Sequence, residues 1–474
     1  MNIRTVMLCC LAPVWLAASG QGVTVTAEDC AIQVTFDWAR AKALSYVHHG
    51  GDPVGLWYEA ALPSREAFCM RDVSHQAVGA HLLGLAAHNK NMLGKFASGI
   101  SESKDFCSFW EIDRLDRPAP VDFANDSAFW YNLPANMDVL QACYKVYEWT
   151  GDRDYITAQP FAAFYDQTVN DYADRWQLQP ENIMSRPRFM NKPADFSTKN
   201  GFHTCRGLPS YAESFSGIAV AIDLLASLSS ANDAYACIAA ARGDTATAES
   251  ARGKAAAYRE IIDSQWWDDA NGRYNTFIKE DGTFHRGEGV PMLLWFGAAG
   301  SSERRKASVD DILSRGWNVE NLSAFPMILY TEGYSDEAYR ILTSLPGNER
   351  ADYPEVSFAV VESIVCGVMG FGSDAATGAV SSLARHPDKK IEARDIPVTG
   401  GHVTLRHVSP TVSEMENRTG GDLTWNVSFA GEHSHVMCAG KIYPASKMKD
   451  THGNVISTAS VPLPDGWCLA AEAL

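Results

Sequence analysis

About a dozen stretches of this chain repeat apolar residues near a 3.6-residue period, and no strand pattern alternates with them. The loops between these stretches are alternately short and long. Without βαβ alternation the chain cannot build a parallel α/β sheet. Helical hairpins that close into a ring would bury one face of every helix. The sequence therefore predicts a mainly α fold, an (α/α)6 toroid, and the lack of a fixed repeat period disfavours a solenoid.

The predicted helices cover residues 33–49, 74–97, 133–149, 161–176, 212–228, 245–267, 291–299, 303–314, 324–331, 335–345 and 355–369. The first of them is expected to end at His48-His49-Gly50-Gly51, and residues 57–68 are expected to form a loop. Gly151-Asp152 and Asn271-Gly272 are the expected ends of two others.

From about residue 391 the pattern changes to one of alternating apolar and polar residues. His402–Val408 and Leu423–Phe429 show it most clearly, and paired glycines punctuate the segments. This pattern predicts a small antiparallel β domain after the toroid. The expected organisation is a signal peptide over 1–22, the toroid as the catalytic domain over 23–390, and the β-sheet domain over 391–474.

The N-terminus has the pattern of a secretory signal peptide. Arg4 supplies a positive charge, residues 6–18 form an apolar run, and residues 17–20 are the small residues that a signal peptidase accepts. The run is too short to be a membrane anchor. The protein is therefore expected to be secreted or periplasmic.

Composition excludes some partners and favours others. A net charge of -17 argues against nucleic acid. Thirteen Trp and 17 Tyr residues suit a protein that binds an oligosaccharide or polysaccharide. No Cys-x-x-Cys pair or helical His-Glu-x-x-His pattern is found, so no metal and no cofactor is expected. The sequence does not indicate the oligomeric state.

The densest cluster of carboxylates and aromatic residues falls within residues 106–140. Prolines divide this segment into turns, so it cannot be one long helix. Indole rings stack on the apolar faces of sugars, and carboxylates bind hydroxyl groups or move protons. A solvated acidic loop over a helical core is the alternative. The residues of this segment predicted to form a sugar site are Trp110, Glu111, Asp113, Asp126 and Trp130.

Two further segments carry charges beside predicted helices. Arg71 and Asp72 could together grip two neighbouring sugar hydroxyls, although Asp72 or Ser74 could equally cap the following helix. Glu213 enters an apolar helix, where burial would raise its pKa as a general acid requires. The alternative for Glu213 is a capping box with Ser210.

Other candidates lie near these segments. His203 and Arg206 precede Glu213 and are expected to line the same mouth. Glu355 begins an apolar helix, where a first-turn carboxylate is often only a favourable partner of the helix dipole. Glu362 lies inside the same helix and needs a partner or a role.

Met70-Arg71-Asp72 before a helix resembles the arginine–aspartate segment that opens the ring in glucoamylases and metal-independent α-mannosidases. The Leu423-Thr424-Trp425 pattern is similar to the C-terminal β domain of α-L-rhamnosidases. In overall plan the chain resembles the six-hairpin glycosidase superfamily, although it lacks the rhamnosidase acid motif and N-terminal β domains.

This resemblance implies glycoside hydrolysis with inversion. Glu213 would be the general acid and Glu355 the general base, because they stand where that superfamily carries its acid and base. The groups expected to position the sugar are Arg71, Asp72, Trp110, Glu111 and Trp130, and Glu111 is the reserve acid. Long loops around the ring favour exo action on an oligosaccharide.

Two alternatives remain open. A polysaccharide lyase acting on a uronate-containing glycan would use a Tyr or His base and an Arg or Asn that neutralises the acid, for which Asn132, His203, Arg206 and Tyr211 are candidates. A non-catalytic carbohydrate-binding protein would need the tryptophans but no acid and base. The acids outnumber the bases in the rich loops, which favours hydrolysis.

Overall fold

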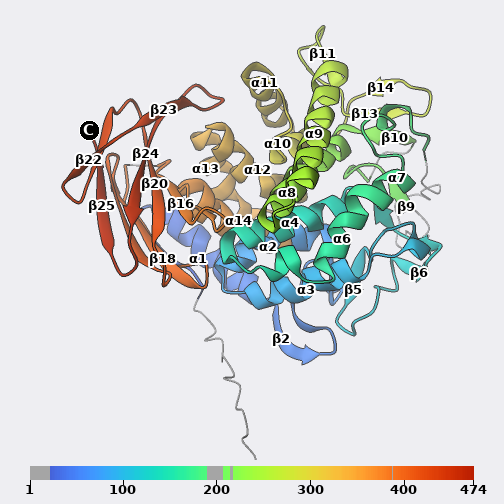
Figure 1. Ribbon diagram of the computed structural model, residues 1–474, viewed down its shortest axis with the longest axis horizontal. Coiled ribbons are helices and arrows are strands. Elements are labelled where there is room, and N and C mark those ends of the chain that lie inside the picture. The colour runs from blue at the N-terminus through green and yellow to red at the C-terminus, as the bar shows by residue number, and fades with distance from the viewer. Residues whose placement is uncertain (1–21, 189–205, 214–216, 387) are drawn as a thin grey trace, which may run out of the picture.

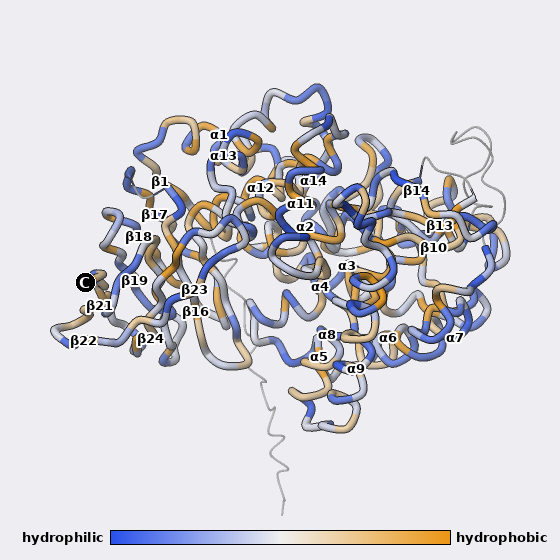
Figure 2. The backbone as a smooth tube through the Cα atoms, turned by 90° about the horizontal axis from the view of Figure 1, so that it is seen from above, coloured by the Kyte–Doolittle hydropathy of each residue, from blue (hydrophilic) through white to orange (hydrophobic). Residues whose placement is uncertain are grey.

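The computed structural model describes residues 22–188, 206–213, 217–386 and 388–474 (Figure 1). Helices fill the first three quarters of the chain and strands dominate the rest. The predicted fold class is confirmed, since an α/α toroid carries a β-sheet module on one side (Figures 1 and 2). No helix in these ranges is both long and apolar enough to span a membrane.

The α-helices are α1 (Cys30–Leu44), α2 (Met70–Leu82), α3 (Ala86–Ser98), α4 (Ala135–Thr150), α5 (Asp154–Thr157), α6 (Phe161–Gln167), α7 (Ala173–Arg175), α8 (Ile222–Arg242), α9 (Thr245–Ile261), α10 (Val290–Trp295), α11 (Ser302–Leu313), α12 (Val319–Glu332), α13 (Ser335–Ser344) and α14 (Pro354–Glu362). Three of them continue as π-helical turns, at Thr168–Tyr172, Ile262–Trp266 and Ser363–Val368.

The inner ring of the toroid can be followed from helix to helix. Among the described helices, α2 packs on α4, α4 on α8, α8 on α10, α10 on α12, α12 on α14, and α14 again on α2. Outside this ring α1 packs on α14, α3 on α2, α9 on α8, α11 on α10 and α13 on α12. The ring closes where Gly79 of α2 meets α14: a Cβ at this position would lie 2.2 Å from the carbonyl oxygen of Phe358. Only glycine permits this approach.

Several predicted helix ends are confirmed. The helix predicted over 133–149 is α4, and it ends at Gly151 in the left-handed conformation, with φ 65°. The helix predicted over 335–345 is α13. The predicted helix over 74–97 is in fact two helices, because the chain turns at Gly84 with φ 82°.

Two predictions at the start of the chain are wrong. The first helix ends at Leu44, and His48 to Gly51 belong to strand β2 (Val47–Asp52). This strand pairs with β3 (Gly55–Tyr58), whose last two residues fall in the segment predicted to be a loop. The imidazole of His48 stacks on the indole of Trp57 at 4.0 Å, a cross-strand pair that the helical periodicity did not reveal.

The predicted helix over 212–228 is wrong at residues 218–221. Residues 218–221 form strand β10 (Ile218–Ala221), which pairs with β13 (Phe277–Lys279), and α8 begins only at Ile222. A short apolar run fits a buried strand and a buried helix equally well, so the distant partner strand decides.

The β module consists of two sheets and is antiparallel except for the pairing of β16 with β20. The larger sheet contains, in spatial order, β1 (Thr24–Ala27), β17 (Ile391–Val398), β18 (Gly401–Ser409), β19 (Val412–Arg418), β25 (Cys468–Ala473), β21 (His435–Cys438) and β22 (Lys441–Pro444). The smaller contains β15 (Gly372–Asp374), β16 (Ala379–Leu383), β20 (Leu423–Ala430), β24 (Val455–Leu463) and β23 (Ser446–Lys449).

The predicted alternation is observed on β20, where Leu423, Trp425, Val427 and Phe429 are buried between more exposed neighbours. Figure 2 shows orange and blue stretches along strands of this module. The sheets also include three strands that precede residue 391, namely β1, β15 and β16. The boundary at residue 390 stays a prediction.

Short strand pairs line the loops of the toroid: β4 (Ala67–Cys69) with β5 (Glu111–Asp113), β6 (Phe123–Asn125) with β7 (Ala128–Phe129), β8 (Tyr131–Asn132) with β9 (Arg206–Leu208), β11 (Trp267–Asp268) with β12 (Arg273–Tyr274), and β13 with β14 (Phe284–His285).

Candidate active site

Residues from the beginnings of the inner helices meet in one cleft. Each inner helix is followed by an outer helix that runs back in the opposite direction. All inner helices therefore run the same way and begin at the same mouth of the ring. A cleft of about 230 Å³ lies there. Its lining residues come from the first two turns of α2, from the first turns of α10, α12 and α14, and from the segments before α8, α10 and α12: Arg71, His75, Tyr211, Glu213, Glu288, Gly289, Met292, Asn318, Glu320, Asn321 and Glu355.

Glu213 is held at this cleft by a cation and an amide. The Arg71 guanidinium lies 3.3 Å from Oε1 of Glu213, and the Asn132 side chain donates to the same oxygen at 2.8 Å. Asn132 belongs to β8, which is fixed by its parallel pairing with β9. The fold thus brings together three separate segments of the chain, those that carry Arg71, Asn132 and Glu213 itself.

Arg71 lies between two aromatic rings. Its guanidinium carbon is 5.6 Å from the Trp110 ring centre and 5.8 Å from that of Tyr211. Burial opposes the charge, yet the neighbouring carboxylates of Glu213 and Asp72 raise the pKa of Arg71 above its ordinary value. These cation–π contacts help to hold the guanidinium at the cleft, where it offers several N–H donors.

The loop that carries Glu213 is anchored by Asp223 in the first turn of α8. Asp223 is fully buried, and its Oδ2 accepts hydrogen bonds from the Ser210 hydroxyl at 2.7 Å and from the Tyr211 backbone N–H at 3.0 Å. Burial raises the pKa of Asp223 to about 7, although these hydrogen bonds oppose the shift. Ser210 therefore donates to Asp223, and no helix begins within the described residues 206–213, so the predicted capping box with Glu213 is not observed there.

Glu355 reaches the cleft from the first turn of α14 and is 6 % exposed. His75 Nδ1 lies 3.4 Å from Oε1 of Glu355, and His75 Nε2 lies 3.7 Å from Oδ1 of Asp138. Burial alone would lower the pKa of His75, but the two carboxylates, Asp138 and Glu355, raise it to about 9. The Tyr211 hydroxyl donates to the same Oδ1 of Asp138.

Asp72 lies beside the cleft without lining it. It is 3 % exposed, and burial followed by the charge of Glu355 raises its pKa. Its Oδ1 has no hydrogen-bond partner among the described residues. Helix α2 begins at Met70 and has no side-chain cap, so neither Asp72 nor Ser74 caps it; the Ser74 hydroxyl donates to the Met70 carbonyl instead.

Glu111 forms a buried ionic cluster next to this site. Its carboxylate lies 2.9 Å from Arg65, which also reaches Asp122 at 3.4 Å. Glu111 is 2 % exposed, and burial followed by the charge of Asp122 raises its pKa. Strand pairing of β4 with β5 sets Glu111 opposite Cys69, immediately before α2. Glu111 does not line the cleft.

The other predicted site residues are placed as follows. Trp130 is 3 % exposed and meets Trp110 edge to face at 6.5 Å, so it packs behind the indole that touches Arg71. Asp113 pairs with Arg117 at 2.8 Å, and Arg206 pairs with Asp105 at 2.8 Å. Asp126 is half-buried.

None of these four residues lines the cleft, and His203 lies outside the described residues.

Several cleft residues were not predicted from the sequence. His75 lines the cleft, and its neighbour Asp138 does not. Both are titratable residues on predominantly apolar helical faces, the same signal that singled out Glu362. Glu288 and Glu320 line the opposite wall, and burial raises the pKa of Glu288. Glu288 precedes α10 and Glu320 lies in the first turn of α12, positions where an acid normally indicates only a favourable helix dipole.

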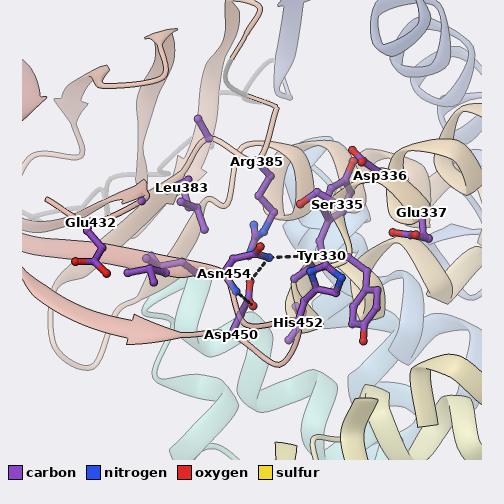
Figure 3. Close-up of a pocket in the computed structure, with 18 residues that line it drawn as sticks. Tyr330, Ser335, Asp336, Glu337, Leu383, Arg385, Glu432, Asp450, His452 and Asn454 are labelled. Carbon is purple, nitrogen blue, oxygen red and sulfur yellow. Dashed lines mark hydrogen bonds between the residues drawn. The ribbon is translucent and has the colours of Figure 1, made fainter. Parts of the chain in front are cut away.

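A second, larger cavity of about 630 Å³ lies where the β module meets α12 and α13 (Figure 3). Contacts between the module and the toroid form part of its wall: the Asn454 side chain donates to the Gly333 carbonyl at 2.9 Å. Within the module the same side chain donates to Asp450 at 2.8 Å. The His452 backbone N–H donates to the Glu332 carbonyl at 3.1 Å. These contacts hold the β module on the toroid.

In the parts of the chain that the structure describes, no three His, Cys, Asp or Glu side chains are arranged to hold a metal ion.

No protein-family model matches the sequence, and comparison with curated protein sequences gives no match. Solved structures do match. The α-L-rhamnosidase from Dictyoglumus thermophilum has 12% identity and a TM-score of 0.61, over 96% of this chain and 50% of that chain. The native α-L-rhamnosidase from Aspergillus terreus has 13% identity and a TM-score of 0.57, over 94% and 50%.

A metal-independent α-mannosidase from Streptococcus pneumoniae has 11% identity and a TM-score of 0.50, over 71% of this chain and 95% of that one. The chain thus spans about half the length of the rhamnosidases that it matches. Its fold is the six-hairpin glycosidase fold, an (α/α)6 toroid followed by a β domain.

Proposed function

We propose that this protein is a glycoside hydrolase that cleaves an oligosaccharide with inversion. The observation that carries the proposal is that Glu213, from the middle of the toroid sequence, and Glu355, from near its end, line one cleft at the mouth of the ring. Glycoside hydrolysis needs two carboxyl groups that face the same glycosidic bond.

In the proposed reaction Glu213 protonates the leaving oxygen while Glu355 takes a proton from water. The water oxygen bonds to the anomeric carbon as the glycosidic bond breaks, so the product gains one water. Arg71 and Asn132 hold Glu213, and Arg71 also offers donors to sugar hydroxyls. Trp110 and Trp130 support Arg71 from behind. A cleft of about 230 Å³ is smaller than most ligand pockets, which supports exo action.

The lyase alternative finds less support. Tyr211 is a weak candidate base, because burial and the charge of Asp138 raise the pKa of its hydroxyl well above the ordinary value. The Asn132 amide donates to Glu213 and Arg206 pairs with Asp105. Neither is therefore poised to neutralise a substrate carboxylate.

Product analysis on a panel of plant, microbial and uronate-bearing glycans tests the proposal. Products heavier by one water, with the anomeric configuration inverted by NMR, are expected. Products of anhydro mass with ultraviolet absorbance would establish a lyase instead. Binding without cleavage, unaffected by Glu213→Gln and Glu355→Gln, would establish a carbohydrate-binding protein.

We also propose export through an N-terminal signal peptide over residues 1–22, on the sequence pattern alone. Cell fractionation together with N-terminal sequencing of the mature protein tests this, and an uncleaved cytoplasmic protein would contradict it.

A further inference from the structure

His75 lies between two carboxylates that come from two other helices. It stands in the second turn of α2, with Nδ1 3.4 Å from Oε1 of Glu355 on α14 and Nε2 3.7 Å from Oδ1 of Asp138 on α4. The three helices are neighbours in the inner ring, since α2 packs on both α4 and α14. The imidazole therefore spans the gap between its two neighbours at the depth of the cleft.

We propose that His75 is a positioning residue, held as an imidazolium between Asp138 and Glu355, which fixes the Glu355 carboxylate for activation of water. This inference rests on the proposed function, in which Glu355 is the base. His75 has the chemistry for the role because only the imidazolium carries an N–H on both sides of the ring. A neutral ring would place a lone pair against one of the two carboxylates.

Charge balance supports the protonated ring. The His75 and Asp138 side chains are 12 % and 1 % exposed, and in such an environment two uncompensated carboxylates would repel each other strongly. The raised pKa of His75, about 9, agrees with this geometry. The titratable groups around the ring, from each element that packs on it, are Asp72, Asp138, Tyr211, Glu355 and Glu362.

All five of these neighbours are acids. Two cations flank the group, Arg71 beside Asp72 and Lys145 beside Glu362, while the imidazolium is the cation between Asp138 and Glu355. Tyr211 adds a second support, since its hydroxyl donates to Asp138 while its ring lies 6.1 Å from that of His75. Asp138 is thereby held from two sides. Because Asp138 is held in place, it orients the His75 ring. The oriented ring in turn holds the Glu355 carboxylate in one orientation towards the cleft.

The first experiment is ¹⁵N NMR of the histidine rings in the intact protein between about pH 6 and pH 10. The expected result is that His75, assigned by its loss in His75→Asn, keeps imidazolium shifts at pH 7 and titrates near pH 9. A His75 ring that is neutral at pH 7 would overturn the inference, whatever the enzyme does. This readout needs no substrate.

The second experiment is kinetic and compares His75→Asn with His435→Asn, whose side chain is exposed in the β module. His75→Asn should lower kcat about 100-fold at nearly unchanged KM, because a misplaced base slows the reaction step. The acid limb of its pH profile should move to higher pH, since a positive charge beside Glu355 is lost. His435→Asn should match the wild type.

Asp138→Asn breaks only the far side of the bridge and keeps the imidazole. Asp138→Asn should lower kcat less than His75→Asn does, and it should make His75 titrate at lower pH. This variant replaces His75→Asn as the test if His75→Asn does not fold. Loss of activity in Glu355→Gln together with wild-type kcat and pH limbs in His75→Asn would refute the inference and leave the proposed function standing. Full activity in Glu355→Gln would refute the proposed function itself.

Discussion

The Arg71 guanidinium lies 3.3 Å from the Glu213 carboxylate, although 142 residues separate the two in the chain. Arg71 is set by the start of α2 and by the rings of Trp110 and Tyr211. Glu213 is set by a loop whose anchor, Asp223, belongs to α8. The proposed acid is therefore positioned by contacts between parts of the ring that the order of the chain keeps apart.

Replacing the proposed base should remove most of the activity. Glu355→Gln keeps the size of the side chain but cannot take a proton from water, so kcat should fall about 10³-fold. Steady-state kinetics measures this. The matched control is Glu349→Gln, an exposed position. Equal rates for both variants would exclude Glu355 as the base.

Replacing the proposed acid should give a loss that depends on the leaving group. Glu213→Gln should slow the cleavage of natural linkages about 10³-fold. In aryl glycosides of acidic phenols the phenolate leaves without being protonated. The rate of their hydrolysis should therefore fall by about tenfold or less. Comparing rates across a series of aryl glycosides measures the difference. A uniform loss across the series would argue that Glu213 only binds the sugar.

Arg71→Lys should weaken activity although it keeps the charge. Lysine cannot present a planar fork of donors, and its compact ammonium makes cation–π contacts of a different geometry to Trp110 and Tyr211. We expect kcat/KM to fall about 100-fold, equivalent to about 2.7 kcal/mol. Circular dichroism should show an unchanged fold. Wild-type kinetics in this variant would mean that only the charge of Arg71 matters.

Asp223 should make stability depend on pH. Its pKa is raised from 3.8 to about 7 in the folded protein, so between these values the folded state binds more protons than the unfolded state. The free energy of unfolding contributed by this group is therefore highest below about pH 4 and declines as pH rises towards 7. Asp223→Asn removes this decline.

Urea unfolding of both proteins at several pH values between about 4 and 8 measures the difference. The stability advantage of the wild type over Asp223→Asn should shrink as pH rises. A constant difference across this range would contradict the assignment. Ser210→Ala is a useful control, because it removes one hydrogen bond to Asp223 and leaves the carboxyl in place.

Arg65→Met should lower the stability of the protein and have little effect on its catalytic activity. Arg65 joins Glu111 and Asp122, which are 2 % and 3 % exposed, and its removal leaves two buried carboxyls without their cation. We expect a loss of about 3 kcal/mol in the free energy of unfolding at pH 8, where the carboxyls are more fully ionised. The loss should diminish at low pH, where both carboxyls are protonated. An equal loss at pH 4 and pH 8 would point to lost packing instead.

Much of the architecture could be predicted because it depends on local patterns. A long helix such as α4 repeats its apolar residues over enough turns to be recognised, and Gly151 marks its end. The alternation on β20 likewise identifies a strand with one buried face. The pattern failed at β2 and β10, because a short apolar or mixed segment takes its structure from the strand that pairs with it.

The sequence by itself determined the class of fold and the residue types that could carry the chemistry, since both follow from periodicity and composition. Only the tertiary structure decided which of these residues meet. In the folded protein Glu213 lies on a loop held by Asp223. His75 lies between Asp138 and Glu355, and Glu111 forms an ion pair with Arg65. The physical reason is that closing the ring brings distant helix ends to one mouth, and burial there makes each charge depend on partners that no local pattern reveals.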